Sequence, residues 1–181
     1  MARQTRQRIL DASLMMFNAQ GEPNVTTNHI ADELEISPGN LYYHFRNKDD
    51  IIEQLFAVYE QRMDTALVAP SGRLPGLEDV WLQLHLVFEC IWDYRFLYRD
   101  LVDILSRNRR LRMRFARILK RADEQAHTVM RGLVQAGVMR ASADEVDAAS
   151  TNILVIATFW MNYASARGDK DERASIRDGI V

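Results

Sequence analysis

Apolar residues recur at intervals of three and four through most of this 181-residue sequence, and no other feature constrains its fold as strongly. A segment with this spacing forms a helix whose apolar face must be covered by neighbouring helices. Only four prolines and eight glycines interrupt the chain, and the clearest break is the stretch 70–76, which contains two of each. Apolar residues make up 48% of the sequence, ample for a core, so we expect an all-α fold.

The periodic segments divide the chain into a series of helices. The expected helices are 3–19, 28–34, a short one after Ser37, 48–67, 77–92, 96–105, a long one that Gly137 ends, and one that Ser142 caps. The apolar stripes are formed in the first by Ile9, Leu10, Ser13, Met16 and Phe17, in the fourth by Ile51, Ile52, Leu55, Phe56, Tyr59 and Met63, and in the fifth by Leu77, Val80, Trp81, Leu84, Val87, Phe88, Ile91 and Trp92. The charged segment after Gly168 ends in apolar residues, and we expect it to be the start of a truncated helix.

The stretch 37–45 predicts a helix that cannot be stable alone. Ser37 is a good N-cap, and Pro38 suits the first helical position, where its missing N–H costs nothing. Gly39 allows another backbone to come close to the start of this helix. Leu41 and Phe45 can both point inward, but a helix this short needs its neighbours to hold it. The side chains left to point elsewhere are those of Asn40, Tyr42, Tyr43 and His44.

A second short helix, 28–34, precedes this one. Thr26 is its expected N-cap, and Ile30 and Ala31 lie on its inward face. Glycine is common in the turn between two such helices, and here Glu35 occupies that position. Two short helices joined by a tight turn form a helix-turn-helix, whose second helix enters the major groove of DNA.

The same residues closely resemble the N-terminal domain of the TetR family of bacterial repressors. The resemblance is carried by Thr26, Thr27, Ile30, Ala31, the run 37–45 and Lys48, together with Ile9, Leu10, Asp11, Ala12, Phe17 and Gly21 in the first helix. It covers roughly the first third of the chain, which makes it far more specific than a lone short motif. It implies a three-helix DNA-binding domain at 1–47, a connecting helix at 48–67, and a C-terminal helical bundle within 48–181 for effector binding and dimerisation.

The resemblance also implies which residues contact DNA. Hydroxyl, imidazole and ammonium groups suit phosphate oxygens. The positions expected to grip the DNA backbone are Thr26, Thr27, Ser37, Tyr42, Tyr43, His44 and Lys48. The positions expected to approach base edges are Asn28, Pro38, Gly39 and Asn40. Asparagine can pair with adenine, and Pro38 can meet a thymine methyl. Structural alternatives stay open, in which Tyr42 packs against the first helix and Asn40 makes a local cap bond.

Charge argues weakly against a nucleic-acid partner. The chain has a net charge of −2, and its first 62 residues hold six Lys/Arg against nine Asp/Glu. A basic domain would be the stronger signature. The basic residues of this part nevertheless lie near helix ends, at Arg3, Arg6, Arg8, Arg46 and Lys48, whereas Asp32, Glu33 and Glu35 cluster around the second helix. The basic start of the chain is either a solvated, frayed end or an arm on the phosphate backbone.

The remaining helices carry aromatic and polar side chains that could line an effector pocket, because pockets commonly form between the helices of a bundle. These candidates are Trp81, His85, Phe88, Glu89, Trp92, Tyr94, Trp160 and Tyr163. The alternative is that they belong to an ordinary core and interface. His85 and Glu89 are also the best acid–base pair in the sequence, although a hydrogen-bonded structural pair is the favoured interpretation.

Two further segments bear on assembly and surface. The stretch 153–161 is apolar on every side and therefore needs two covering surfaces. One is the core, and in the TetR family the last two helices pair with a second subunit. Ile153, Ile156 and Trp160 are accordingly expected in a dimer interface. The stretch 104–122 has no acidic residue and many arginines, but apolar residues keep helical spacing through it, so the arginines are expected to form a solvated outer face.

Nothing in the sequence supports an enzyme. The four histidines make no pair at metal-ligand spacing, and neither a phosphate-binding glycine loop nor a Gly-x-Ser-x-Gly elbow is present. We therefore expect no catalytic residue, metal or cofactor. The single cysteine, Cys90, excludes an intramolecular disulfide and suits a reducing cytoplasm. No signal peptide is expected, and the longest apolar run is too short to span a membrane.

The sequence thus indicates a cytoplasmic, homodimeric transcriptional regulator, most simply a repressor, that binds a palindromic operator in double-stranded DNA and is released by a small-molecule effector. The alternative is a helical ligand-binding or interaction protein that retains the fold without specific DNA binding. The acidic balance of the first 62 residues keeps this alternative open.

Overall fold

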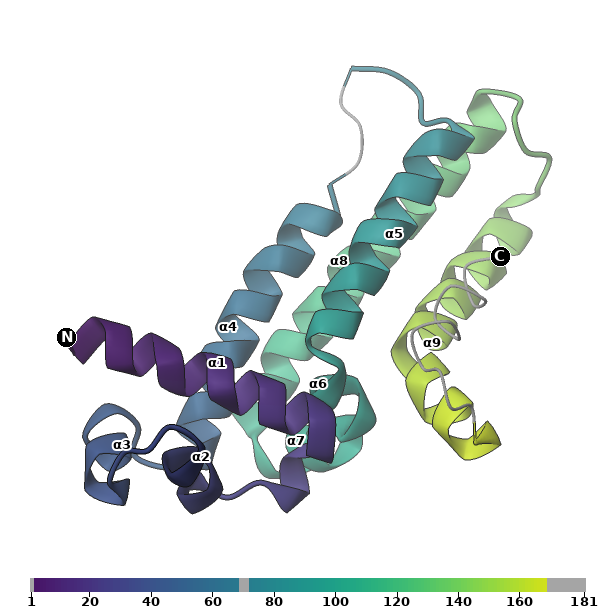
Figure 1. The fold of residues 1–181 in the computed structure, drawn as a ribbon. Helices are drawn as coiled ribbons and strands as arrows, with labels where there is room; N and C mark the ends of the chain where they lie inside the picture. Colours follow the sequence, from purple (N-terminus) through teal and green to yellow (C-terminus); the bar gives the residue numbers. More distant parts are fainter. Residues whose placement is uncertain (1, 69–71, 169–181) are drawn as a thin grey trace.

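A computed structural model describes residues 2–68 and 72–168, which form helices joined by short connections (Figure 1). The elements are α1 (Ala2–Gln20), the 3-10 helix η1 (Glu22–Asn24), α2 (Thr27–Glu33), α3 (Pro38–His44), α4 (Lys48–Ala66), α5 (Leu77–Asp93), α6 (Arg95–Arg99), α7 (Leu101–Arg107), α8 (Arg109–Gln135) and α9 (Ala143–Arg167). These ranges contain no strand, so the predicted all-α fold is confirmed. The helix expected after Gly168 lies outside the described residues, as does part of the break at 70–76.

Polar side chains fix where several helices begin. In α2, α3, α4, α8 and α9, the residue before the helix accepts a hydrogen bond from a backbone N–H of the first turn. These capping residues are Thr26, Ser37, Asn47, Asn108 and Ser142. Each cap contributes about 1 kcal/mol. At α9 the Ser142 N–H donates in turn to the Glu145 carboxylate, which completes the predicted capping box.

The three N-terminal helices pack with the start of α4 around one apolar centre, and we call residues 2–47 the head. Ile9 and Phe17 of α1, Ile30 of α2 and Leu41 of α3 are fully buried there. All of the inward residues predicted for the first and fourth helices are buried. Because each short helix contributes only one or two of these residues, the head depends on α1 and α4 for its stability.

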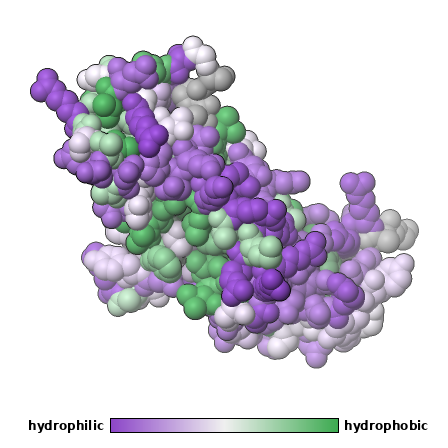
Figure 2. Space-filling model, turned by 180° about the vertical axis from the view of Figure 1, so that it is seen from behind, coloured by the Kyte–Doolittle hydropathy of each residue, from purple (hydrophilic) through white to green (hydrophobic). Residues whose placement is uncertain are grey.

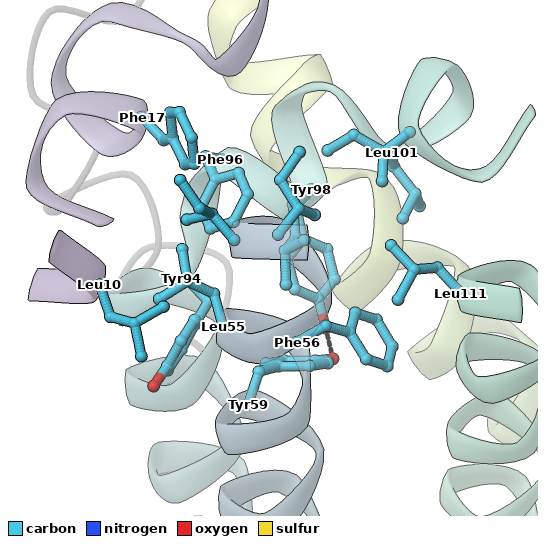
Figure 3. Close-up of a cluster of buried hydrophobic side chains, with 14 of the residues drawn as sticks. Leu10, Phe17, Leu55, Phe56, Tyr59, Tyr94, Phe96, Tyr98, Leu101 and Leu111 are labelled. Carbon is cyan, nitrogen blue, oxygen red and sulfur yellow. Dashed lines mark hydrogen bonds between the residues drawn. The ribbon is translucent and has the colours of Figure 1, made fainter. Parts of the chain in front are cut away.

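An aromatic cluster joins the head to the remaining helices, which we call the body. The rings of Phe17 in α1 and Phe96 in α6 lie 5.3 Å apart. The hydroxyls of Tyr59 in α4 and Tyr98 in α6 are 2.6 Å apart, and Figure 3 shows this bond inside the cluster. Burial raises the pKa of both phenols. The cluster therefore fixes α4 against α6 by apolar packing and one buried hydrogen bond.

In the body, α4 contacts α5 and α8, whereas α9 packs on α8 and α6 (Figure 1). Two expectations are wrong here. The helix expected at 96–105 is broken at Asp100, whose backbone leaves helical geometry and whose carboxylate accepts the N–H of Glu22. Leu77 and Trp81 were expected to face inward but are exposed. Their part of α5 begins beyond the end of α4 in Figure 1, so it lacks that neighbour. No helix of the described ranges is long and apolar enough to cross a membrane.

Candidate nucleic-acid interface

Helix α3 is anchored from inside and capped at its start. Leu41 and Phe45 are buried in the head. The Ser37 hydroxyl accepts the N–H of Asn40 at 3.2 Å, and Pro38 occupies the first helical position. This local structure follows the sequence prediction closely, because capping and helical spacing act over only a few residues.

The turn between α2 and α3 places Glu35 in the left-handed conformation, with φ 54°. The N–H of Glu35 donates to the carbonyl of Asp32 at 3.1 Å, and the N–H of Ile36 donates to the carbonyl of Ala31 at 3.0 Å. These two bonds form a Schellman motif, which ends α2 and directs the chain into α3. Glycine normally fills this position. Because glutamate has a Cβ atom, the left-handed conformation costs it about 1–2 kcal/mol of backbone strain.

A side-chain hydrogen bond joins α2 to α3, and two others cap the start of α2. The hydroxyls of Thr27 in α2 and Tyr42 in α3 are 2.9 Å apart. Thr26 caps α2 by accepting the N–H of His29 at 3.2 Å, and its own N–H donates to His29 Nδ1 at 3.4 Å. The Tyr42 hydroxyl therefore bonds to α2, whereas the alternative considered for this residue was packing against α1.

The outer surface of this helix pair is open. Tyr43 is 79% exposed, and Asn28, Pro38 and Asn40 are exposed as well. Neither asparagine side chain has a hydrogen-bond partner in the described part of the chain, and the local cap bond of Asn40 uses its backbone N–H. A Cβ atom added at Gly39 would meet only the Ser37 hydroxyl, at 3.9 Å. The space beside Gly39 is therefore open to another molecule.

Lys48, the first residue of α4, is held inside the protein. Its ammonium donates to the carbonyls of Glu22 and Val25, each at 3.0 Å, and forms an ion pair with the Glu22 carboxylate at 2.8 Å. An ammonium has three N–H donors, and three protein oxygens surround this one. The phosphate contact predicted for Lys48 thus requires an exchange of partners.

Two arginines lie beside α3: Arg46, which the sequence analysis placed near a helix end without assigning it a contact, and Arg6, in the basic start for which an arm on the phosphate backbone was one of two alternatives. The Arg46 side chain is 86% exposed and makes a two-pronged bond to Asp50, with both distances 2.8 Å. This bond lowers the pKa of the Asp50 carboxyl. The Arg6 guanidinium lies 5.0 Å from the centre of the Phe45 ring. His44, at the end of α3, is partly buried and meets the Tyr43 ring edge-on. The signal that could have added Arg46 to the predicted DNA contacts was its position in the sequence directly after the short helix.

The eight candidate effector-site residues occupy different environments. Trp81 and His85 stack on each other at the exposed start of α5. Phe88 and Tyr94 are buried, whereas Glu89 and Trp92 are partly buried. Trp160 and Tyr163 make a ring contact on α9. Two cavities, of about 280 and 360 Å³, lie elsewhere along α8 and are lined by none of these eight residues. The residues lining the first cavity are Asp64, Leu67, Arg121, Glu124 and Gln125.

Several apolar side chains on the outer side of α9 are exposed in the described part of the chain. Ile153 and Ile156, which the sequence placed in a dimer interface, are exposed, and so are Val155 and Phe159. Trp160 is half-buried and packs partly against the core. Figure 2 shows the face on which α8 lies, where hydrophobic side chains gather in the middle of a hydrophilic surround. Large exposed apolar patches on soluble proteins are commonly sites of contact with other molecules.

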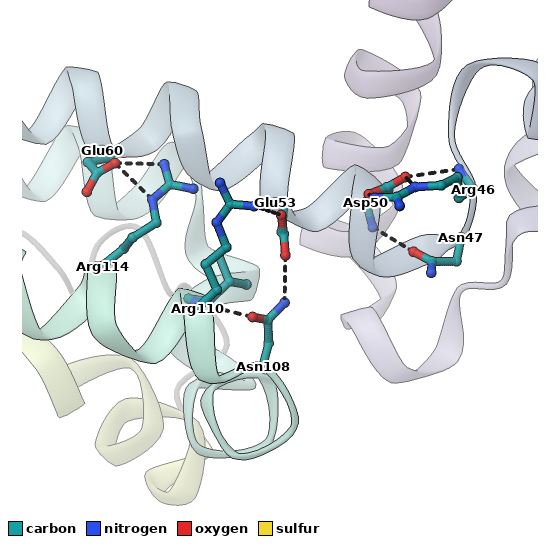
Figure 4. Close-up of polar contacts among 9 residues, drawn as sticks. Arg46, Asn47, Asp50, Glu53, Glu60, Asn108, Arg110 and Arg114 are labelled. Atoms are coloured by element: carbon teal, nitrogen blue, oxygen red, sulfur yellow. Dashed lines mark hydrogen bonds and ion pairs between the residues drawn. The ribbon is translucent and has the colours of Figure 1, made fainter.

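The arginines of α8 are only partly a solvated face. Three of them form ion pairs with acidic residues of α4, and Figure 4 shows two of these pairs, Arg110 with Glu53 and Arg114 with Glu60. The third pair joins Arg121 to Asp64. Arg109, Arg112 and Arg117 are exposed, as expected. Arg110 is 76% exposed and agrees with the predicted solvated face. The prediction was wrong for Arg114, whose side chain is 15% exposed, because its partner is distant in the sequence.

In this structure α2 is followed by a tight turn and by the capped helix α3, whose outer side is exposed. This arrangement defines the class of helix-turn-helix DNA-binding proteins. Within that class, the chain belongs to the TetR family. Residues 58–181 match the family described as bacterial transcriptional repressors, and residues 9–55 match the family described as bacterial regulatory proteins, tetR family.

Individual relatives agree with this assignment. The crystal structure of a TetR-family transcriptional regulator from Marinobacter aquaeolei VT8 is 40% identical, covers 97% of this chain and 85% of its own, and superposes with a TM-score of 0.88. The HTH-type regulator TtgW of Pseudomonas putida is 41% identical over 71 residues, 39% of this chain and 53% of TtgW. The HTH-type repressor KstR2 of Mycolicibacterium smegmatis is 35% identical over 80 residues, 40% of this chain and 38% of KstR2. The chain thus matches about half or less of these curated relatives.

Proposed function

We propose that this protein is a homodimeric transcriptional repressor that reads a palindromic operator in double-stranded DNA with α3. The observation that carries the proposal is the outer surface of the α2–α3 pair. There the Tyr43 ring and the amides of Asn28 and Asn40 face solvent on helices that are anchored from the opposite side. Membership of a family of bacterial regulatory proteins supports this use of the surface.

The proposed contacts fall into two groups. Residues that grip phosphates are Thr26, Thr27, Ser37, Tyr42, Tyr43, His44 and Lys48, to which the structure suggests adding Arg46. Residues that approach base edges are Asn28, Pro38, Gly39 and Asn40. The hydroxyls of Thr26, Thr27, Ser37 and Tyr42 already have protein partners, so each would contact phosphate while keeping or exchanging its present bond. The Asn40 amide is free for a two-bond contact with adenine.

Dimerisation would make this contact useful. One short recognition helix buries little surface, whereas two linked helices bind two half-sites with much higher combined affinity. The apolar side of α9, with Ile153, Ile156 and Trp160, is the proposed interface. We further propose that residues 1–47 form the DNA-binding unit, that 48–181 form the effector-binding and dimerisation unit, and that the protein acts in the cytoplasm.

Effector release would require a ligand that binds the non-DNA form more tightly, since equal affinity shifts no equilibrium. The body offers two alternative effector sites. One is formed by the eight aromatic and polar residues chosen from the sequence, and the other is the cavity beside Asp64 and Arg121. In either case α4 is a direct route, because it follows the head directly and packs against α1 of the head and against α5 and α8 of the body. A ligand that binds tightly but leaves operator affinity unchanged would contradict release by that ligand.

Selection of binding sites from a random duplex library tests the proposal. The parent protein should enrich a two-fold symmetric sequence. Asn40→Ala should relax preference at one base pair per half-site, by about 1–3 kcal/mol if its contact is two-pronged. Asn24→Ala, which removes an exposed asparagine outside the α2–α3 pair, should keep the parent's preference. Failure to enrich any sequence, with ligand binding retained, would favour the alternative of a ligand-binding protein without specific DNA binding.

A further inference from the structure

Glu22 is a charged residue in a fully buried position. It opens η1, directly after α1, and its side chain is 0% exposed. A carboxylate in such a place requires cationic partners. Two approach it from different parts of the fold, Lys48 Nζ at 2.8 Å from the start of α4 and the Arg107 guanidinium at 2.6 Å from the end of α7. Glu22 therefore sits between a proposed DNA contact and the body.

Lys48 cannot serve a phosphate in this arrangement without losing a partner. Its ammonium donates to the carbonyls of Glu22 and Val25 and lies 2.8 Å from the Glu22 carboxylate, with which it forms an ion pair. Its side chain is still 24% exposed, and it follows α3 by only a few residues, so an outside anion can reach it. A DNA phosphate and the Glu22 carboxylate are chemically alike in this respect, since both accept hydrogen bonds and carry negative charge.

Arg107 determines what happens to Glu22 after such an exchange. Burial by itself would lower the pKa of this guanidinium, but the bond and charge of Glu22 raise it, so Arg107 stays cationic. Its remaining acidic neighbours are more distant, Asp103 at 3.7 Å and Asp49 at 4.0 Å. With Arg107 in place, Glu22 keeps a cation when Lys48 turns outward. Without Arg107, release of Lys48 would leave a buried carboxylate unpaired, which is strongly unfavourable.

We infer that Glu22 competes with DNA phosphate for Lys48, and that Arg107 of α7 weakens this competition. The inference rests on the proposed DNA-binding function. Asp100, between α6 and α7, accepts the N–H of Glu22 at 3.0 Å, so η1 is tied to the same part of the body. A displacement of α7 away from Glu22 would thus tighten the hold on Lys48 and weaken DNA binding. This gives the body a route to the head besides the one through α4.

The test measures operator affinity against salt concentration for the full-length protein and a duplex enriched by selection. Arg107→Met should behave as if Lys48 were absent and lower the logarithmic salt slope by about 0.9 per subunit. Glu22→Gln frees Lys48 and should bind about tenfold more tightly with at least the parent's slope. Glu22→Gln combined with Arg107→Met should recover the parent's slope. Arg110→Met, which removes a cation that pairs with Glu53 and not with Glu22, should leave the slope unchanged.

A purely structural role for the cluster gives a different pattern. Glu22→Gln and Arg107→Met would then both weaken binding, and their combination would not recover the slope; that result overturns the inference. If Glu22→Gln does not fold, Arg107→Lys serves as the comparison. Arg107→Lys retains the positive charge and should keep the parent's salt slope, whereas Arg107→Met should not. A loss of slope in both Arg107 variants overturns the inference. A parent protein that selects no DNA overturns the proposed function and this inference with it.

Discussion

The strained turn between α2 and α3 offers the sharpest stability prediction. Glu35 has φ 54°, a conformation that costs a residue with a Cβ about 1–2 kcal/mol and costs glycine nothing. Glycine loses more chain entropy on folding, by roughly 0.5–1 kcal/mol. Because Glu35 is exposed, its side chain contributes little to offset the strain. Glu35→Gly should therefore raise the free energy of unfolding by about 0.5–1 kcal/mol, the difference between these terms.

Urea unfolding followed by circular dichroism measures this change. The midpoint should rise while the slope with urea stays constant, since the surface exposed on unfolding is unchanged. Glu33→Gly is the matched control, because Glu33 is also exposed but lies in α2, where glycine costs roughly 0.5–1 kcal/mol. The two substitutions should shift the midpoint in opposite directions. A destabilising effect of Glu35→Gly similar to that of Glu33→Gly would refute the strain argument.

The structure supports three other predictions. Tyr59→Phe or Tyr98→Phe should each cost about 1–3 kcal/mol by leaving the other buried hydroxyl unpaired, and the double substitution should cost much less than the sum, as urea unfolding would show. The pKa of the Asp79 carboxyl is lowered to about 2, mainly by the hydrogen bond from Arg73. Asp79 should therefore contribute stability above pH 4 that is lost as the pH falls toward 2, and Asp79→Asn should remove that part of the pH dependence of unfolding. Phe159→Glu should reduce the dimer fraction in light scattering, because a charge on the apolar side of α9 opposes its burial.

Each of these has a defined control. If the double substitution cost as much as the two single substitutions added together, the buried hydroxyl bond would be contradicted. For the pH effect, the sign follows from the direction of the shift: the unfolded chain binds the Asp79 proton more tightly than the folded one, so stability rises with pH between about 2 and 4. Thr151→Glu, at an exposed polar position of α9, should leave the dimer intact. A monomeric parent protein at micromolar concentration would contradict the proposed interface.

The parts of the fold that sequence predicted well depend on short-range chemistry. Ser37, Thr26 and Ser142 cap the helices as expected, because a cap involves residues only three positions apart. The left-handed turn at Glu35 was located for the same reason, from the spacing of two short helices. Apolar spacing likewise identified the buried faces of α1 and α4.

The failures concern contacts between distant segments. The break at Asp100 reflects a bond to Glu22, 78 residues away, and no local pattern signals it. The pair Arg114–Glu60 spans 54 residues, so periodicity could not separate this partly buried arginine from the solvated ones. Trp81 was assigned to a buried stripe because the sequence does not show how far the start of α5 extends beyond the end of α4 (Figure 1). Lys48 was identified as a DNA contact without any sign of its buried carboxylate partner.

Footprinting of the DNA that flanks the gene for this protein tests the central claim most directly. A dimer reading DNA with α3 should protect two symmetric segments whose centres are one helical turn apart, about 34–36 Å, or a multiple of that spacing. Asn40→Ala should shift the protection within each segment while the dimer persists. Absence of protected DNA, at concentrations where light scattering shows a folded dimer, would contradict the account of α3 as the reading helix.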